Sequence, residues 1–76
     1  MSVTAINTRN QFKGSVVAIN RGPVVSEVEI ETPAGVISAV VTTSSIDRLS
    51  LRIGDSALAL FKATEVLIAK IGDQAA

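Results

Sequence analysis

The sequence has 76 residues, the length of one small domain, with seven basic and seven acidic side chains and no formal net charge. A balanced chain with an isoelectric point near 6.1 lacks the basic surface that nucleic acids and anionic membranes attract, and it has only two aromatic residues to stack on bases. The absence of cysteine and histidine excludes disulfides and thiolate chemistry and removes the commonest general base.

The hydrophobic content is high for so short a chain, at 47%, and nearly all of it is aliphatic. A domain of this size buries only about 60% of the surface that its unfolded chain exposes. The surplus of aliphatic side chains therefore predicts burial between subunits of a homo-oligomer. No stretch approaches the roughly 20 apolar residues of a membrane helix, and the N-terminus lacks the apolar core of a signal peptide, so we expect a cytoplasmic protein.

Three β-strands are predicted in the first part of the chain. Residues 12–21 are rich in β-branched side chains and predict the first strand, which Gly22 and Pro23 end. Residues 24–32 alternate between core-type and acidic positions, so the second strand has one core face and one solvated face with three glutamates. A Pro-Ala-Gly turn leads to the third strand, residues 36–43, which is apolar on both faces.

The periodicity then changes to that of a helix over residues 44–51, and a turn follows. Residues 56–62 predict a fourth strand and residues 64–71 a fifth. Five strands with a short helix between the third and the fourth predict an all-β fold, a small antiparallel barrel of the oligonucleotide/oligosaccharide-binding (OB-like) type, formed by a single domain over residues 1–76. An SH3-like barrel is the alternative.

Four hydroxyl residues, at positions 42 to 45, separate the third strand from the helix. A helix N-terminus presents unpaired N–H groups and a partial positive charge, where an oxyanion can bind. Thr42 ends the strand and Ser45 lies in the first helical turn, so their hydroxyls can converge in front of the helix. We expect Thr43 or Ser44 to act as the helix cap.

Two basic residues flank predicted strands. Lys62 closes the fourth strand and would lie near Thr42 if the ends of the third and fourth strands approach each other. Arg9 precedes the first strand, and its planar guanidinium suits a tetrahedral oxyanion. From the residues alone, the alternative is that both side chains merely lie on the surface. The three glutamates of the second strand are expected to be solvated, because without histidine or a closing loop they make a poor metal site.

The chain resembles a known family in four blocks, which follow one another as NTRNQFKGSVVAINRG, VSEVEIE, VVTTSSIDRLSLRIGD and ALALFKATEVLIA. The similarity extends over roughly residues 6 to 69. They are similar to the molbindins, the small molybdate-binding Mop domains. The resemblance implies a five-stranded barrel and a homohexamer arranged as a trimer of dimers, with molybdate or tungstate bound at the subunit interfaces and no metal ion held directly.

The resemblance also implies which residues bind the oxyanion. In the family pattern, one subunit supplies a Ser-Ala-Arg-Asn segment, and a neighbour supplies a threonine, a serine three residues later and a lysine. The matching positions here are Asn7, Thr8, Arg9 and Asn10, and then Thr42, Ser45 and Lys62. The chain departs from the pattern at Asn7 and Thr8, where the family has serine and alanine, although the Asn7 amide can still donate.

The expected function is storage and homeostasis of molybdate or tungstate, with no reaction performed, since the chain has no nucleophile motif and no glycine-rich phosphate loop. One alternative is a regulatory or sensor module of a molybdate transport system that acts through a partner. The other is a nucleic-acid-binding barrel, which the neutral charge and scarce aromatic residues disfavour.

Overall fold

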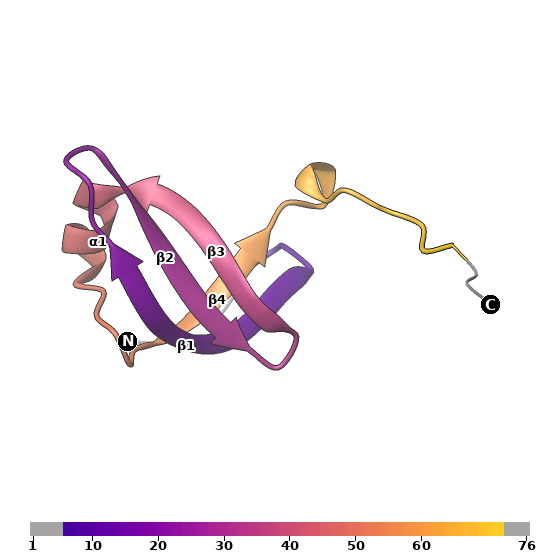
Figure 1. Ribbon diagram of the computed structural model, residues 1–76, viewed down its shortest axis with the longest axis horizontal. Helices are drawn as coiled ribbons and strands as arrows, with labels where there is room; N and C mark the ends of the chain where they lie inside the picture. The colour runs from indigo at the N-terminus through magenta and orange to yellow at the C-terminus, as the bar shows by residue number, and fades with distance from the viewer. Residues whose placement is uncertain (1–5, 73–76) are drawn as a thin grey trace.

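The computed structural model describes residues 6–72 as a strongly curled antiparallel sheet with one short helix (Figure 1). The strands lie in the order β3-β2-β1-β4. The helix α1 joins β3 to β4, as predicted, and a short 3-10 turn, η1, follows β4. The elements are β1 (Asn10–Asn20), β2 (Val25–Thr32), β3 (Gly35–Thr42), α1 (Thr43–Leu49), β4 (Ser56–Phe61) and η1 (Ala63–Glu65).

The longest strand, β1, belongs to both halves of the sheet. Its first half pairs with β4, from Asn10 opposite Phe61 to Ser15 opposite Ser56. Its second half pairs with β2, and the register shifts by one residue between Val16 and Ala18. Such a bulge bends a strand and increases its twist. The bend lets a single strand curl the sheet around one core.

Gly14 lies just before this bend, where β1 passes very close to β2. A Cβ atom at this position would lie 2.0 Å from the carbonyl oxygen of Glu31 and 2.9 Å from the Thr32 methyl group. No side chain larger than hydrogen fits there. Glycine is therefore required for the close crossing of the two strands.

The predicted alternation of β2 is confirmed. Ser26, Val28 and Ile30 are buried, whereas the glutamates between and after them are half-buried or exposed. The buried valine and isoleucine pack with Val16 of β1 and Ile46, the one buried residue of α1. Because Ile46 belongs to this cluster, α1 closes one end of the curled sheet.

The turn between β2 and β3 has the chemistry that its Pro-Ala-Gly sequence predicts. Gly35 has a φ of 117°, which strongly favours glycine. The Thr32 hydroxyl donates to the Gly35 carbonyl at 2.8 Å and accepts from the N–H of Ala34 at 3.1 Å. These bonds fix the turn, and the register of β3 against β2 follows from it.

The structure differs from the prediction at the fifth strand. β4 ends at Phe61, η1 follows, and the chain then leaves the body of the molecule as an extended segment (Figure 1). A strand is defined by its pairing, and within residues 6–72 no strand pairs with residues 64–71. A single chain therefore forms four strands of an OB-like barrel and leaves its sheet open between β3 and β4.

The part of the chain that the structure describes contains no helix that is long and apolar enough to cross a membrane.

Candidate functional site

Residues from both ends of the described chain line a surface hollow. It lies between the segment before β1 and the turn after β4, and we call it the arginine–lysine hollow. The pairing of Asn10 with Phe61 brings these two segments together. Its lining residues are Asn7, Thr8, Arg9, Lys62, Ala63 and Thr64.

Thr8 holds the two segments in place. Its hydroxyl donates to the carbonyl oxygen of Phe61 at 2.6 Å and accepts from the N–H of Asn10 at 3.4 Å. The Gln11 side chain donates to the Thr8 carbonyl. Because the Thr8 hydroxyl hydrogen is used on the chain itself, Thr8 positions the hollow and has no side-chain hydrogen left for a ligand.

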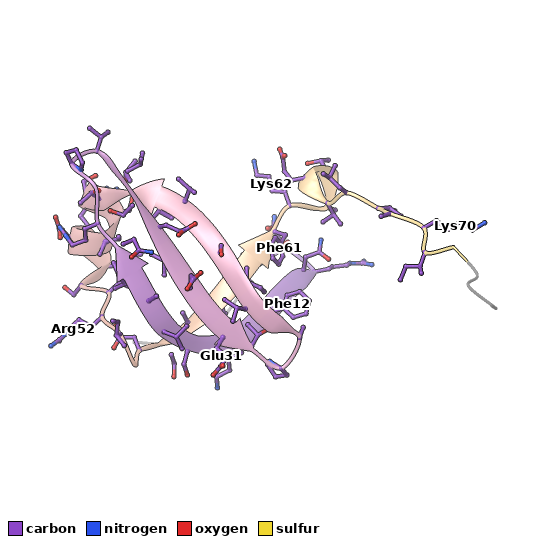
Figure 2. The ribbon with its side chains drawn as sticks, viewed as in Figure 1. Phe12, Glu31, Arg52, Phe61, Lys62 and Lys70 are labelled. Atoms are coloured by element: carbon purple, nitrogen blue, oxygen red, sulfur yellow. The ribbon has the colours of Figure 1, made fainter. Side chains whose placement is uncertain are left out.

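The arginine–lysine hollow is electropositive. Arg9 and Lys62 both line it, and its lining includes no carboxylate. In residues 6–72 the one salt bridge within 4 Å joins Arg21 to Asp47, so the charges of Arg9 and Lys62 have no acidic partner there. Figure 2 shows Lys62 at the edge of the molecule, just beyond Phe61. The planar guanidinium of Arg9 and the rotatable ammonium group of Lys62 are both N–H donors, and together they suit a small anion.

The second group of candidate residues lies at the start of α1. Thr42, and not Thr43 or Ser44, caps this helix, so the predicted cap was wrong. Thr42 has an extended backbone conformation, and its hydroxyl accepts from the N–H of Ser45 at 3.2 Å. The cap and the predicted oxyanion donor are therefore the same residue.

The hydrogen bonds among the hydroxyl groups at the start of α1 leave one hydroxyl hydrogen free. The Thr42 oxygen accepts from the N–H of Ser45 and from the Ser44 hydroxyl, at 3.3 Å, which uses both lone pairs. Its own hydrogen therefore goes to the Ser45 oxygen, 2.6 Å away. The Ser45 hydroxyl hydrogen then remains available, so Ser45 is the outward donor of the pair.

Arg48 is a residue that the sequence reasoning missed. It lines a second hollow with Ser45 and Leu49, and its guanidinium lies 3.5 Å from the Ser45 oxygen. The signal was present in the sequence, because residues three apart on a helix lie on the same face. The start of α1 thus adds a third cation to the candidate residues.

Thr43 fixes the position of α1 against the sheet. Its hydroxyl donates to the Gly22 carbonyl at 2.7 Å and lies 2.6 Å from the hydroxyl of the buried Ser26. Ser26 in turn accepts from the N–H of Gly22 at 3.2 Å. This network ties the first helical residue to β2 and to the turn before it, and so fixes where Thr42 and Ser45 lie.

We expect Thr43→Val to lower the free energy of unfolding by about 1–3 kcal/mol, because valine keeps the shape but leaves the Gly22 carbonyl without its donor and the Ser26 hydroxyl hydrogen without its acceptor. Urea unfolding measures the change. Ser44→Ala, at the neighbouring exposed position, is the control and should change stability by no more than about 0.5 kcal/mol. Equal stabilities of Thr43→Val and the unchanged protein would show that the network does not hold the helix.

The direction of the strands separates the two groups of candidate residues within one chain. β3 runs parallel to β1 and ends at Thr42, opposite Val25 and beyond the end of β1. β4 runs antiparallel to β1 and ends beside its start, next to Lys62. Figure 1 accordingly shows α1 and η1 on opposite sides of the sheet. The expectation that Lys62 approaches Thr42 is therefore wrong for a single chain, and Lys62 lies with Arg9 instead.

Comparison with known proteins identifies the family. Residues 6–68 match the TOBE domain. The chain is 41% identical over 64 residues to a probable molybdenum-pterin-binding protein of Haemophilus influenzae. The matched region is 83% of this chain and 93% of that protein. It is 42% identical over 66 residues to the molybdenum transport protein ModE of Herbaspirillum seropedicae, but it spans only 24% of that protein with 86% of its own length.

Solved structures show the same fold. MopII from Clostridium pasteurianum matches with a TM-score of 0.82 and 34% identity, over 87% of this chain and all of that one. A molybdate-binding protein from Sporomusa ovata also matches with a TM-score of 0.82, at 31% identity, over 88% of this chain and all of that one. The second of these neighbours is named as a molybdate-binding protein.

An open sheet with a short helix between its third and fourth strands defines a small all-β domain of the OB-like class. The chain belongs to the TOBE-domain family, and within that family to the molbindins, which confirms the resemblance in its sequence.

Proposed function

We propose that the protein binds molybdate or tungstate at sites shared between copies of a homo-oligomer, and that it stores and buffers the oxyanion in the cytoplasm. The observation that carries the proposal is the arginine–lysine hollow, where Arg9 and Lys62 lie together without a carboxylate. The relatives support the choice of oxyanion, because they are named for molybdenum-pterin, molybdate or molybdenum transport.

The separation of the candidate residues supports a site made by two copies. One chain offers Arg9 and Lys62 at one end of β1, and Ser45 with Arg48 at the other. A tetrahedral oxyanion needs donors on several sides, and one hollow supplies them on one side only. When the helix start of one copy meets the arginine–lysine hollow of another, the donors surround the ligand. The proposed assembly is a homohexamer built as a trimer of dimers.

Each predicted site residue has a role in this proposal. Arg9, Lys62 and Ser45 donate to the oxyanion directly. Thr42 orients Ser45 through the 2.6 Å contact of their hydroxyls, and Thr8 holds the hollow in shape through Phe61. Asn7 lines the hollow, and its side-chain amide is an additional donor. The proposed activity is binding without catalysis.

The donor set predicts selectivity among anions. Molybdate is fully deprotonated at neutral pH, whereas phosphate keeps at least one proton there and needs an acceptor for it. A site of donors alone leaves that proton unpaired, at a cost of about 1–3 kcal/mol, or roughly five- to a hundredfold in affinity. Sulfate is rejected less strongly, because only its smaller size counts against it. Tungstate, nearly as large as molybdate, should bind about equally well.

Competition calorimetry with the four anions at one pH and one ionic strength tests this selectivity. Phosphate that displaces molybdate at comparable concentration would show that the site contains an acceptor, which the proposed residues do not provide. Metal analysis after dialysis against molybdate, together with the mass in solution, tests the shared site. A monomer that binds molybdate fully would exclude a site between copies.

A regulatory module is the second candidate, because the chain also matches about a quarter of two ModE proteins, 24% and 25% of their lengths. A sensor acts through a partner whose binding depends on the ligand. Affinity chromatography of a cell extract over the immobilised protein, with and without molybdate, separates the two roles. Storage requires no partner whose retention changes with molybdate, whereas sensing requires one.

A further inference from the structure

The hydroxyl groups at the start of α1 form a series of hydrogen bonds that runs in one direction. The Ser44 hydroxyl and the Ser45 N–H both donate to the Thr42 oxygen, at 3.3 and 3.2 Å. The Thr42 hydrogen is therefore directed to the Ser45 oxygen, 2.6 Å away. The hydroxyl hydrogens thus point from Ser44 through Thr42 to Ser45, and none of these bonds uses the hydroxyl hydrogen of Ser45.

Arg48 follows Ser45 by three residues on the same face of α1 and adds a second donor to the Ser45 oxygen. Its guanidinium nitrogen Nη2 lies 3.5 Å from the Ser45 Oγ and can only donate. A hydroxyl oxygen has two lone pairs, and here Thr42 occupies one and Arg48 the other. The Ser45 hydroxyl therefore has one capacity left, which is to donate its own hydrogen.

The guanidinium of Arg48 is not engaged by an acidic side chain. In residues 6–72 the one salt bridge within 4 Å joins Arg21 to Asp47, at 3.0 Å, so the carboxylate next to Arg48 in sequence already has a partner. Arg48 is exposed and lies outside the core cluster, so the packing does not depend on it. It lines the second hollow together with Ser45. Its chemistry is thus directed at Ser45.

We propose that Arg48 is a positioning residue that makes Ser45 a donor-only group and thereby excludes protonated oxyanions from the site. The inference rests on the proposed binding of molybdate by Ser45 and identifies the residue that sets the selectivity there. Molybdate offers only acceptors, and one of them meets the Ser45 hydrogen. Hydrogen phosphate brings a hydrogen that needs an acceptor, and the Ser45 oxygen has no lone pair left for it.

Without Arg48, the Ser45 oxygen regains a free lone pair. It can then accept the hydrogen of a protonated anion, while its own hydrogen still donates to another oxygen of the same ligand. In the proposed site a second copy covers Ser45, so water does not supply the missing acceptor. An unpaired donor in such a place weakens binding by roughly five- to a hundredfold, and loss of Arg48 relieves part of this penalty.

Phosphate and sulfate are the two probes that isolate this effect. At mildly alkaline pH both are mainly dianions of similar size, and they differ in that phosphate keeps one hydrogen. A change in the charge of the protein therefore weakens both alike, and the ratio of their dissociation constants reports the hydrogen. Displacement of molybdate in competition calorimetry at fixed ionic strength measures both constants.

Three variants of exposed arginines make the test specific. Arg48→Met removes the donor and keeps a long side chain, and it should shift the ratio toward phosphate by about fivefold or more. Arg48→Lys keeps a donor and should retain most of the discrimination. Arg52→Met is the matched control, because Arg52 is an exposed arginine outside both hollows, and it should leave the ratio unchanged.

The outcomes separate this inference from the proposed function. An Arg48→Met protein that binds molybdate with the ratio of the unchanged protein overturns the inference and leaves the proposed function standing. An equal shift in Arg52→Met would also overturn it, because the effect would then come from charge. Complete loss of molybdate binding in a folded Arg48→Met protein would make Arg48 a direct ligand and overturn the positioning role. If the unchanged protein binds no molybdate, the proposed function fails and the inference fails with it.

Discussion

Replacing Lys62 with alanine is expected to weaken molybdate binding by about ten- to a hundredfold while the sheet stays folded. The substitution removes one charge-assisted hydrogen bond, worth about 1.5–3 kcal/mol. Lys62 is exposed, lies outside the core cluster and caps η1 without a side-chain bond, so its loss leaves the packing intact. Calorimetric titration with molybdate measures the affinity, and circular dichroism checks the fold.

Lys13→Ala is the matched control for Lys62→Ala. Lys13 is also an exposed lysine, but it lies on β1 and outside the arginine–lysine hollow. Both variants remove one positive charge, so a difference between them reports position and not net charge. If the two titrations agree with each other, Lys62 is an ordinary surface lysine and the site lies elsewhere.

The strands and the helix position were predictable because the signals for them are local. β2 alternates between buried and solvated residues, and this pattern needs no knowledge of its partner. Gly35 and Pro33 mark a turn by backbone chemistry alone. The helix cap was wrong by one residue, since Thr42 is half inside the helix and any of the four neighbouring hydroxyls has the chemistry of a cap.

The fifth strand and the grouping of the site residues could not be predicted in the same way, because both depend on distant parts of the chain. Residues 66–71 have the composition of a strand, but whether they pair is decided by the edges available to them. Arg9 and Lys62 were each found from their chemistry, yet their proximity follows from the antiparallel pairing of Asn10 with Phe61.

At Thr8 the chain departs from the family pattern, and the threonine has a structural contact that alanine could not make. The pattern has alanine there, and the resemblance alone places Thr8 among the oxyanion-binding residues. In the structure its hydroxyl donates a hydrogen bond to the carbonyl oxygen of Phe61, the residue before Lys62. The Thr8 hydroxyl thus adds a connection between β4 and the segment before β1, and in the proposed site Thr8 acts through the shape of the hollow.

Replacing Gly14 with alanine is expected to lower the free energy of unfolding by about 3 kcal/mol or more, the largest stability effect of any substitution considered for this protein. The new Cβ would lie 2.0 Å from the Glu31 carbonyl oxygen, well inside the 3.0 Å below which real Cβ atoms are essentially never found, and a backbone atom cannot rotate away. β1 must therefore move away from β2 at this point. Gly14 also lies opposite Ala57 of β4, so the movement disturbs the pairing of β1 with β4 that holds the arginine–lysine hollow together. Ser15→Ala, at the next and exposed position, is the control and should change stability by no more than about 0.5 kcal/mol. Urea unfolding of both variants measures the change in stability. Molybdate titration of the folded variants in the absence of urea measures the change in binding. A Gly14→Ala protein as stable as Ser15→Ala would mean that β1 and β2 do not cross as closely as the structure has them.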